Sequence, residues 1–148
     1  MVTGMTEGVI YHLLVHGNAH RLHGCDAFDH AVDARELERF VGDPGHELVF
    51  ATIDDLVVGF ASGTVLRHPD KAPAFFINEV GVDVPWRRRG VARALCRRLI
   101  ERARAMGCTG IWLATEADNA AARALYRSLS ARETRGIVVY DWDGAMDG

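Results

Sequence analysis

The most constraining feature of the sequence is the stretch over residues 78–94, NEVGVDVPWRRRGVARA, where a strand-type pattern changes to a helical one within a few positions. The apolar run over residues 75–84 is typical of a buried strand, and Pro85 closes it. From Arg88 onward, apolar residues recur at helical spacing with arginines on the other face, and Gly107 supplies a C-terminal stop. A strand that leads through a short turn into a helix predicts a chain of mixed α and β structure.

The sequence on either side of this stretch extends the mixed pattern. Strands are predicted over residues 8–15, 47–53, 56–66, 111–115 and 136–142, and helices over residues 33–42 and 120–129. Asp33 and Asn119 are suited to cap the two helices. Residues 16–25 fit either a helix or a loop.

A chain of 148 residues suits one domain with a core of its own. We expect a single α/β (α+β) domain over residues 1–148, in which residues 1–7 form a loose end. The order of the elements predicts a mixed, mostly antiparallel central sheet flanked by helices.

Charge and composition exclude several classes of protein. The formal charge is −3, from 17 basic and 20 acidic residues, whereas a dedicated nucleic-acid binder normally has a basic excess. No apolar run approaches the roughly 20 residues of a membrane span, and the N-terminus lacks the pattern of a signal peptide. Cys25, Cys96 and Cys108 are an odd number without CxxC spacing, so we expect free thiols and a cytoplasmic location.

The start of the arginine-rich helix is a candidate anion site. Backbone N–H groups at a helix start lack helical acceptors and carry a partial positive charge. Gly90 and Ala92 are small where a ligand would approach the backbone, and three arginines add positive charge. These features suit a pyrophosphate. The alternative is a charged helix start that binds nothing. The sequence has neither a GKS/GKT Walker motif nor the G-x-G-x-x-G dinucleotide fingerprint.

Two motifs resemble the GNAT superfamily of acyl-coenzyme A dependent N-acetyltransferases. They are I-N-E-V-G-V-x-x-x-x-R-R-R-G-V-A-R-A-L over residues 77–95 and D-N-A-A-A-R-A-L-Y over residues 118–126, in the order and spacing of that family. Within the superfamily, Glu79, the A-L-Y helix and the Y-D-W-D ending over residues 140–143 are most similar to the small aminoglycoside 3-N-acetyltransferases.

The resemblance implies acetyl-coenzyme A as cosubstrate and no metal. Backbone groups at the start of the helix would hold the coenzyme pyrophosphate, and the strand before it would pair with the pantetheine arm. The residues implied for coenzyme binding are Val80, Gly81, Val82, Val84, Arg87, Arg88, Arg89, Gly90, Val91, Ala92, Arg93 and Asn119. Asn119 either contacts the coenzyme or only caps its helix.

Acetyl transfer to an amine needs a base for the amine, a stabilised oxyanion and a proton for the leaving thiolate. Glu79 is the candidate base, because an apolar strand would raise the pKa of its carboxyl; otherwise it points to solvent. Tyr126 is the candidate acid, and its alternative is a core tyrosine with a satisfied hydroxyl. Neither motif contains a cysteine nucleophile, so we expect direct transfer in a sequential mechanism.

Acidic residues indicate the acceptor. Clustered carboxylates favour a polycation, although ordinary surface acidity explains them equally. The carboxylates expected on the acceptor side are those of Glu79, Glu116, Asp118, Asp141 and Asp143. The main hypothesis is an aminoglycoside, acetylated at the 3-N position by resemblance and as a form of antibiotic resistance. The alternatives are another small amine, a protein N-terminus, or a non-catalytic acyl-coenzyme A binding module.

Some features fall outside these motifs. The family usually has a glycine after the A-L-Y helix, where this chain has Ser130, and a serine in a left-handed helix end costs about 1 kcal/mol. His16, His20 and His23 fall at helical spacing, but no cysteine or carboxylate completes a metal site with them. Many small GNAT proteins pair, so a homodimer is expected by resemblance only.

Overall fold

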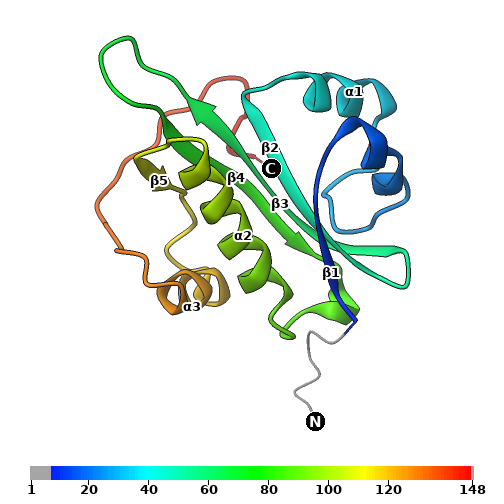
Figure 1. The fold of residues 1–148 in the computed structure, drawn as a ribbon. Coiled ribbons are helices and arrows are strands. Elements are labelled where there is room, and N and C mark those ends of the chain that lie inside the picture. Colours follow the sequence, from blue (N-terminus) through cyan, green and yellow to red (C-terminus); the bar gives the residue numbers. More distant parts are fainter. Residues whose placement is uncertain (1–7, 148) are drawn as a thin grey trace. The chain divides into compact units, whose positions relative to one another are not determined.

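The structure, a computed structural model, describes residues 8–147 and divides into two compact units, one ending at Glu116 and one beginning at Ala117. The first unit holds a five-stranded sheet in the order β1-β2-β3-β4-β5 (Figure 1). Its strands are β1 (Ile10–Leu13), β2 (His46–Ile53), β3 (Leu56–Leu66), β4 (Ala74–Val82) and β5 (Gly110–Trp112). The first four strands pair antiparallel, and β5 pairs parallel with β4. The expected mixed, mostly antiparallel sheet is confirmed. The expected loose end at residues 1–7 lies outside the described residues.

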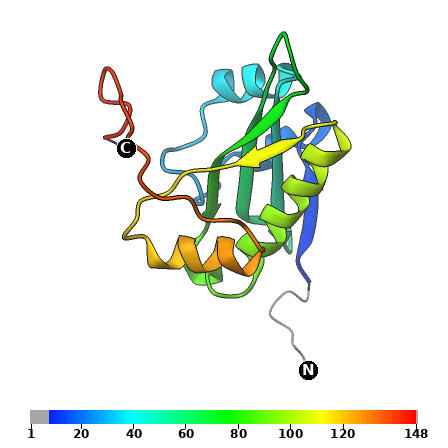
Figure 2. The same cartoon turned by 90° about the vertical axis from the view of Figure 1, so that its left-hand side faces the viewer.

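Helices cover both faces of this sheet (Figure 2). One face packs against α2 (Val91–Ala105), whose buried Leu95 and Leu99 join the apolar residues of β2, β3 and β4. The other face packs against the 3-10 helix η2 (His16–Leu22) and α1 (Ala34–Gly42). None of the helices within residues 8–147 is both long and apolar enough to cross a bilayer.

Strand β4 contains a β-bulge at Asn78. Ser62 of β3 pairs with Glu79. The next residue along β3, Gly63, pairs with Ile77, so Asn78 has no pairing partner on β3. Simple alternation from Ile77, which lies in the core under α2, would carry Glu79 under the same helix. Because the bulge adds one residue, Glu79 lies on the opposite face of the sheet, where Ser62 also lies.

Strands β4 and β5 pair over only part of their length. Their pairing runs from Ala74 with Gly110 to Phe76 with Trp112 and stops just before the bulge. Within residues 8–116, no other strand pairs with the outer edge of residues 77–82. This edge therefore presents backbone N–H and C=O groups without strand partners in the first unit.

The second unit contains α3 (Ala120–Ser128). At its end the N–H of Ser130 donates to the carbonyl of Arg127 at 2.9 Å, and the N–H of Ala131 donates to that of Tyr126 at 3.1 Å. Ser130 has a φ of 65°, in the left-handed region. This is the Schellman pattern, and the prediction of a serine in a left-handed helix end is confirmed.

Ion pairs tie α3 to the chain that follows it. Arg123 contacts both oxygens of Glu133 at 3.1 Å, and Arg127 and Arg135 contact the same carboxylate. Hydrogen bonds from Arg123 and then from Arg135 lower the pKa of Glu133 to about 2. Glu133 therefore stays ionised throughout the physiological range.

The strand predicted over residues 136–142 is wrong. Residues 131–147 form no helix or strand in the structure. The apolar side chains of this segment are between 56% and 80% exposed, and they are Ile137, Val138, Val139, Tyr140 and Trp142. Their β propensity is not sufficient, because a strand needs a neighbour for its backbone and the described second unit holds no other strand.

Candidate active site

The turn between β4 and α2 is held by its own side chains. Asp83 accepts a hydrogen bond from the N–H of Val84 at 3.0 Å, which starts the 3-10 turn η3 (Val84–Trp86). The Arg87 guanidinium donates through Nε to the carbonyl of Val82 at 2.9 Å, so this arginine ties the turn back to the strand. Arg87 was expected to bind the coenzyme, and the contact that the structure gives its Nε is a structural one.

The N-terminus of α2 is left open to an anion. Its cap is Gly90, with a left-handed φ of 81° and no side chain to accept from the first turn. The first turn carries no acidic residue, and Ala94 makes the first helical hydrogen bond, to the carbonyl of Gly90. The amides of Val91 and Ala92 precede that bond, where helix geometry leaves N–H groups directed out of the helix. The helix start therefore combines open amides with a positive dipole end.

Arginines surround this helix start. Arg88 and Arg89 are both exposed, and Arg88 has a left-handed φ of 62°. The Arg89 guanidinium lies 5.2 Å from the centre of the Trp86 ring, which holds it beside the turn. Together with the uncapped helix, these charges suit the pyrophosphate expected from the sequence.

The coenzyme residues predicted on the strand lie at the open edge of β4. Val80 and Gly81 are half-buried, and Val82 is buried. Their backbone belongs to the part of β4 that β5 does not pair with. Val84 follows in η3 and is 67% exposed. The strand edge and the start of α2 are thus consecutive along the chain, as a ligand with an extended arm and a phosphate group requires.

A loop that the sequence did not assign to the site packs on the face of the sheet that carries Glu79. Residues 25–32 connect η2 to α1 and pack on the face of the sheet that carries Glu79. The Phe28 ring stacks on Phe60 with centres 3.8 Å apart. A Cβ at Gly81, which pairs with Phe60, would collide with the carbonyl of Ala27. Gly81 is therefore required for the loop to approach β4 so closely.

The electrostatic surroundings of Glu79 favour its protonated form. Its side chain is exposed, but partial burial still raises the pKa of its carboxyl above the ordinary 4.5. The negative charge of Asp29 raises this pKa further, and His30 lowers it. The direction agrees with the expectation for a base in an apolar strand. Asp29 and His30 were missed because their electrostatic effect on Glu79 depends on the path of the loop, for which the sequence holds no local signal.

The remaining predicted residues lie in the second unit. Asn119 Oδ1 accepts from the N–H of Ala122 at 3.0 Å, so its capping role is confirmed, and coenzyme contact stays a prediction. Tyr126 is half-buried within α3. Asp141 accepts from the N–H of Met146 at 3.1 Å, and Asp143 has a left-handed φ of 57°, so both lie in the terminal turns.

The predicted acceptor carboxylates are divided between the two compact units. Glu79 and Glu116 belong to the first unit, whereas Asp118, Asp141 and Asp143 belong to the second. Among the described residues, no group of three or more metal-ligating side chains occurs, and the histidines of η2 are no exception.

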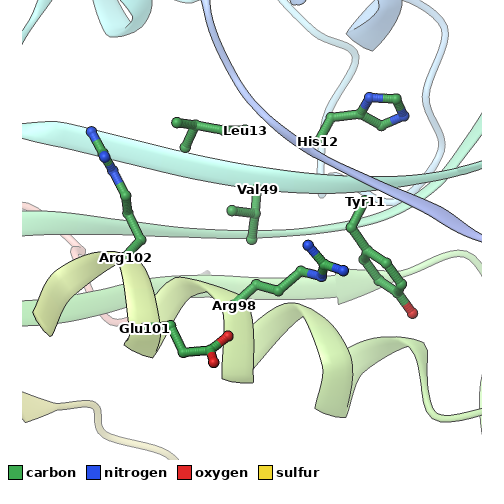
Figure 3. Close-up of a pocket in the computed structure, with 7 residues that line it drawn as sticks. All are labelled: Tyr11, His12, Leu13, Val49, Arg98, Glu101 and Arg102. Atoms are coloured by element: carbon green, nitrogen blue, oxygen red, sulfur yellow. The ribbon is translucent and has the colours of Figure 1, made fainter. Parts of the chain in front are cut away.

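A separate cavity of about 320 Å³ lies between β1 and α2 (Figure 3). Arg98 and Arg102 reach across it from the helix. The Arg98 guanidinium lies 4.7 Å from the centre of the Tyr11 ring, and Arg102 Nε lies 2.6 Å from Glu47 Oε1. These contacts join the edge strand and β2 to α2, and no residue predicted to be functional lines the cavity.

Comparison with known proteins agrees with this geometry. A family model described as the acetyltransferase (GNAT) family matches residues 10–130. The [ribosomal protein bS18]-alanine N-acetyltransferase of Salmonella typhimurium is 39% identical over 82 residues, which are 55% of this chain and 52% of that protein. The chain thus spans about half the length of the curated relative that it matches.

Solved structures share the fold at lower sequence identity. An aminoglycoside acetyltransferase from an uncultured soil metagenomic sample has a TM-score of 0.78 and 16% identity, covering 94% of this chain and 99% of that one. A ribosomal-protein-alanine N-acetyltransferase from Brucella melitensis biovar Abortus 2308 has a TM-score of 0.70 and 23% identity, covering 90% and 99%.

Proposed function

This chain belongs to the GNAT family of acetyltransferases, and on that premise we propose that it transfers acetyl from acetyl-coenzyme A to the N-terminal amine of a protein. The observation that carries the proposal is the placement of Glu79. Its side chain lies on the face of β4 opposite α2, one strand segment before the uncapped start of that helix.

Acetyl-coenzyme A binds along β4 and at the start of α2. The backbone edge of residues 80–82 pairs with the pantetheine arm, and the backbone N–H groups after Gly90 donate hydrogen bonds to the pyrophosphate. Support comes from the unpaired edge, the absence of an acidic residue in the first turn and the exposed Arg88 and Arg89. Main-chain groups do most of this work, so the side chains around them are free to vary.

The acetyl group moves in one direct step. Glu79 takes a proton from the ammonium, and the freed nitrogen lone pair attacks the thioester carbonyl carbon. A backbone N–H near Val80 stabilises the resulting oxyanion. When the carbon–sulfur bond breaks, the leaving thiolate takes up one proton and the attacking nitrogen loses its second one, and Tyr126 stays the candidate acid expected from the sequence. The amide, the free thiol and one proton released to solvent balance the reaction.

Two arguments favour a protein N-terminus as the acceptor. First, the Salmonella relative acts on a protein alanine by its name, and it shares 39% identity with this chain over the matched segment. Second, an α-amine has a pKa of about 7.7–8.0, well below the roughly 10.4 of a lysine amine, so a carboxylate base deprotonates it readily. The similarity to aminoglycoside enzymes is one of fold.

The test is thiol release from acetyl-coenzyme A by the purified protein, with the uncatalysed background subtracted. Acceptors are peptides with free N-terminal alanine, the same peptides with a blocked N-terminus, aminoglycosides and polyamines. We expect turnover with the free peptides and none with the blocked ones. Turnover confined to aminoglycosides would keep the acetyl transfer and refute the protein acceptor. Coenzyme binding without turnover on any amine would instead indicate a binding module.

A further inference from the structure

Resting on the proposed acetyl transfer, we propose that Phe76 and Trp112 form an aromatic ledge that selects acceptor peptides with an apolar side chain at their second or third residue. The aromatic ledge lies on the sheet face that carries Glu79, and all three residues belong to the first unit. The substrate class is therefore a protein N-terminus that continues into an apolar residue, and Trp112 is a residue that determines specificity.

The register of the sheet places both rings on the face opposite α2. Phe75 and Ile77 are buried in the core under α2, so Phe76 between them points to the other face. Phe76 pairs with Trp112 of β5, and paired residues of neighbouring strands share a face. Their ring centres are 4.5 Å apart and the ring planes are tilted by 57°. The two rings therefore support each other in a fixed position.

The aromatic ledge is open on its outer side. The helices of this face, η2 and α1, pack against buried residues of β2 and β3. Trp112 is 53% exposed, and neither it nor Phe76 joins a hydrophobic cluster of the described residues. A large aromatic side chain that is fixed in position and exposed is the usual anchor point for an apolar group of a partner.

The distance from Glu79 to the aromatic ledge suits a peptide. Strand β3 provides the measure, because Thr64 pairs with Phe76. Ser62, two residues earlier, pairs with Glu79. Two residues of a regular strand span about 7 Å, and an extended peptide covers about the same length in two residues. An acceptor with its amine at Glu79 thus brings its second or third side chain to the ledge.

The groups between Glu79 and the rings also suit a peptide. Asn78 is exposed in the bulge, and its Nδ2 donates to Thr64 Oγ1 at 2.9 Å, which holds the amide in place. A carboxylate, an oriented amide and two rings thus follow one another along this face of β4. They match the ammonium, the first peptide bond and an apolar side chain of an N-terminal peptide.

The first experiment measures thiol release from acetyl-coenzyme A by the full chain with alanyl peptides of one length. They carry leucine or serine at the second and third residues, and a control peptide carries the leucines from the sixth residue onward, beyond the ledge. We expect a KM about tenfold lower for the leucine peptide than for the serine peptide. The value of kcat stays similar, because the ledge binds ground state and transition state alike. The control peptide behaves like the serine peptide.

Variants of Trp112 assign the preference to the ledge. In Trp112→Ala we expect the KM of the leucine peptide to rise to that of the serine peptide, with coenzyme A affinity unchanged. Trp112→Phe keeps an aromatic ring and retains most of the preference. Leu56→Ala is the matched control, because Leu56 is 52% exposed at the start of β3, and it keeps the full preference.

Peptide binding is also followed without turnover, with coenzyme A in place of acetyl-coenzyme A. We expect the leucine peptide to change the tryptophan emission of the wild type. The emission of Trp112→Phe, which retains Trp86 and Trp142, stays constant.

Each outcome decides one of the two proposals. Equal KM values for the leucine and serine peptides in the wild type, or a lost preference in Leu56→Ala, would overturn the role of the ledge. So would a preference that persists in Trp112→Ala while its oligomeric state or its stability changes, since a second copy or the chain itself would then cover the rings. No turnover with any amine, while the leucine peptide still changes the emission, would fail the proposed function and keep the ledge. The absence of both signals would fail both.

Discussion

A single carboxylate controls the pH behaviour expected of this protein. Partial burial and the neighbouring Asp29 raise the pKa of Glu79 above 4.5 in the folded state. A carboxyl with a raised folded pKa stabilises the fold below 4.5, and this contribution is lost as pH rises through the folded pKa. Catalysis needs the opposite form, because only the ionised carboxylate accepts a proton. The form of Glu79 that the proposed base role needs at neutral pH is therefore the one in which its carboxyl no longer adds to the stability of the fold.

Replacement of the base tests this assignment. For Glu79→Gln we expect turnover at neutral pH to fall about 10²-fold, with coenzyme A affinity unchanged, since the amide cannot take a proton. In the wild type, we expect kcat/KM to rise with pH through the folded pKa of Glu79. In Glu79→Gln this rise of kcat/KM with pH is expected to be absent. Glu101→Gln on α2 is the matched control and keeps wild-type rates. Wild-type kinetics in Glu79→Gln would remove it from the mechanism.

The serine in the left-handed end of α3 offers a test of stability alone. Ser130 has a φ of 65°, a conformation that costs a side chain with a Cβ about 1–2 kcal/mol. Ser130→Gly removes this cost but increases the conformational entropy of the unfolded chain, which offsets part of the gain. We therefore expect the free energy of unfolding, measured with urea, to rise by about 0.5–1 kcal/mol. Ser128→Gly, two positions earlier inside the helix, should lose stability. A loss in both variants would contradict the interpretation.

The buried hydroxyl of Tyr11, in the edge strand β1, is expected to reduce the stability of the fold. Tyr11 Oη is buried, and within residues 8–147 it has no hydrogen-bond partner, while its ring packs under Arg98. Tyr11→Phe keeps the ring and removes the unsatisfied hydroxyl, so we expect a gain of about 1 kcal/mol in the free energy of unfolding. His12→Ala, which removes a ring stacked on Phe50, is expected to destabilise in the same assay. Destabilisation by Tyr11→Phe would show that the hydroxyl is paired in solution.

At the scale of the element, α2 has glycines with a positive φ at both ends. Gly90 precedes the helix with a φ of 81°, and Gly107 follows it with a φ of 85°. A side chain at either position costs stability, because the left-handed region is unfavourable for any residue with a Cβ. Only Gly90 adjoins the amides proposed to bind pyrophosphate. Substitutions at the two ends of α2 therefore distinguish the effect of backbone strain from the effect on ligand binding.

This symmetry gives a matched pair of variants. We expect Gly90→Ala and Gly107→Ala to lose similar stability, about 1–2 kcal/mol in thermal unfolding. Coenzyme A affinity, measured by calorimetry, falls roughly tenfold or more in Gly90→Ala alone, since a Cβ there intrudes on the phosphate position. Equal affinities in the two variants would refute the pyrophosphate assignment.

Elements with strong local signals were predicted well. The period of α2 and the caps at Asp33 and Asn119 follow from neighbours within one helical turn, and the structure confirms them. The bulge at Asn78 was not predicted, because the run from Phe75 reads as one continuous strand and the extra residue is defined only by pairing with β3. The prediction of a strand over residues 136–142 failed for a related reason, since local β propensity does not supply a neighbouring strand for its backbone to pair with.

At the scale of the whole molecule, the family and the sheet could be predicted from the sequence, and the surroundings of the base could not. The hairpin of β2 and β3 and the β4–α2 motif together determine the order of most of the sheet. The contact between the η2–α1 loop and β4 depends on packing between Phe28 and Phe60, for which neither segment alone gives a signal.

Ligand binding should be visible in the stability of the whole protein. A ligand that binds only the folded state adds about 2.7 kcal/mol of stability at a concentration 100 times its Kd. We expect coenzyme A to raise the unfolding temperature by an amount that grows with its concentration relative to Kd. Pantetheine, which lacks the nucleotide, is expected to raise it less at the same concentration. Identical shifts with both compounds would show that the phosphates contribute nothing, against the site at α2.

The bulge of β4 also determines what a deletion of Asn78 would do to the protein. Loss of the single codon for Asn78 would leave Ile77 facing the core and Glu79 facing away from it, so every side chain downstream keeps its face. The strand would lose its bulge. The pairing between β4 and β5, which now stops at Phe76, would then be able to extend further along the edge of β4. Such a deletion would pass unnoticed in an assay of folding and appear only in a screen for acetylation. The residue whose loss would leave every side chain on its face is thus one on which the proposed coenzyme edge depends.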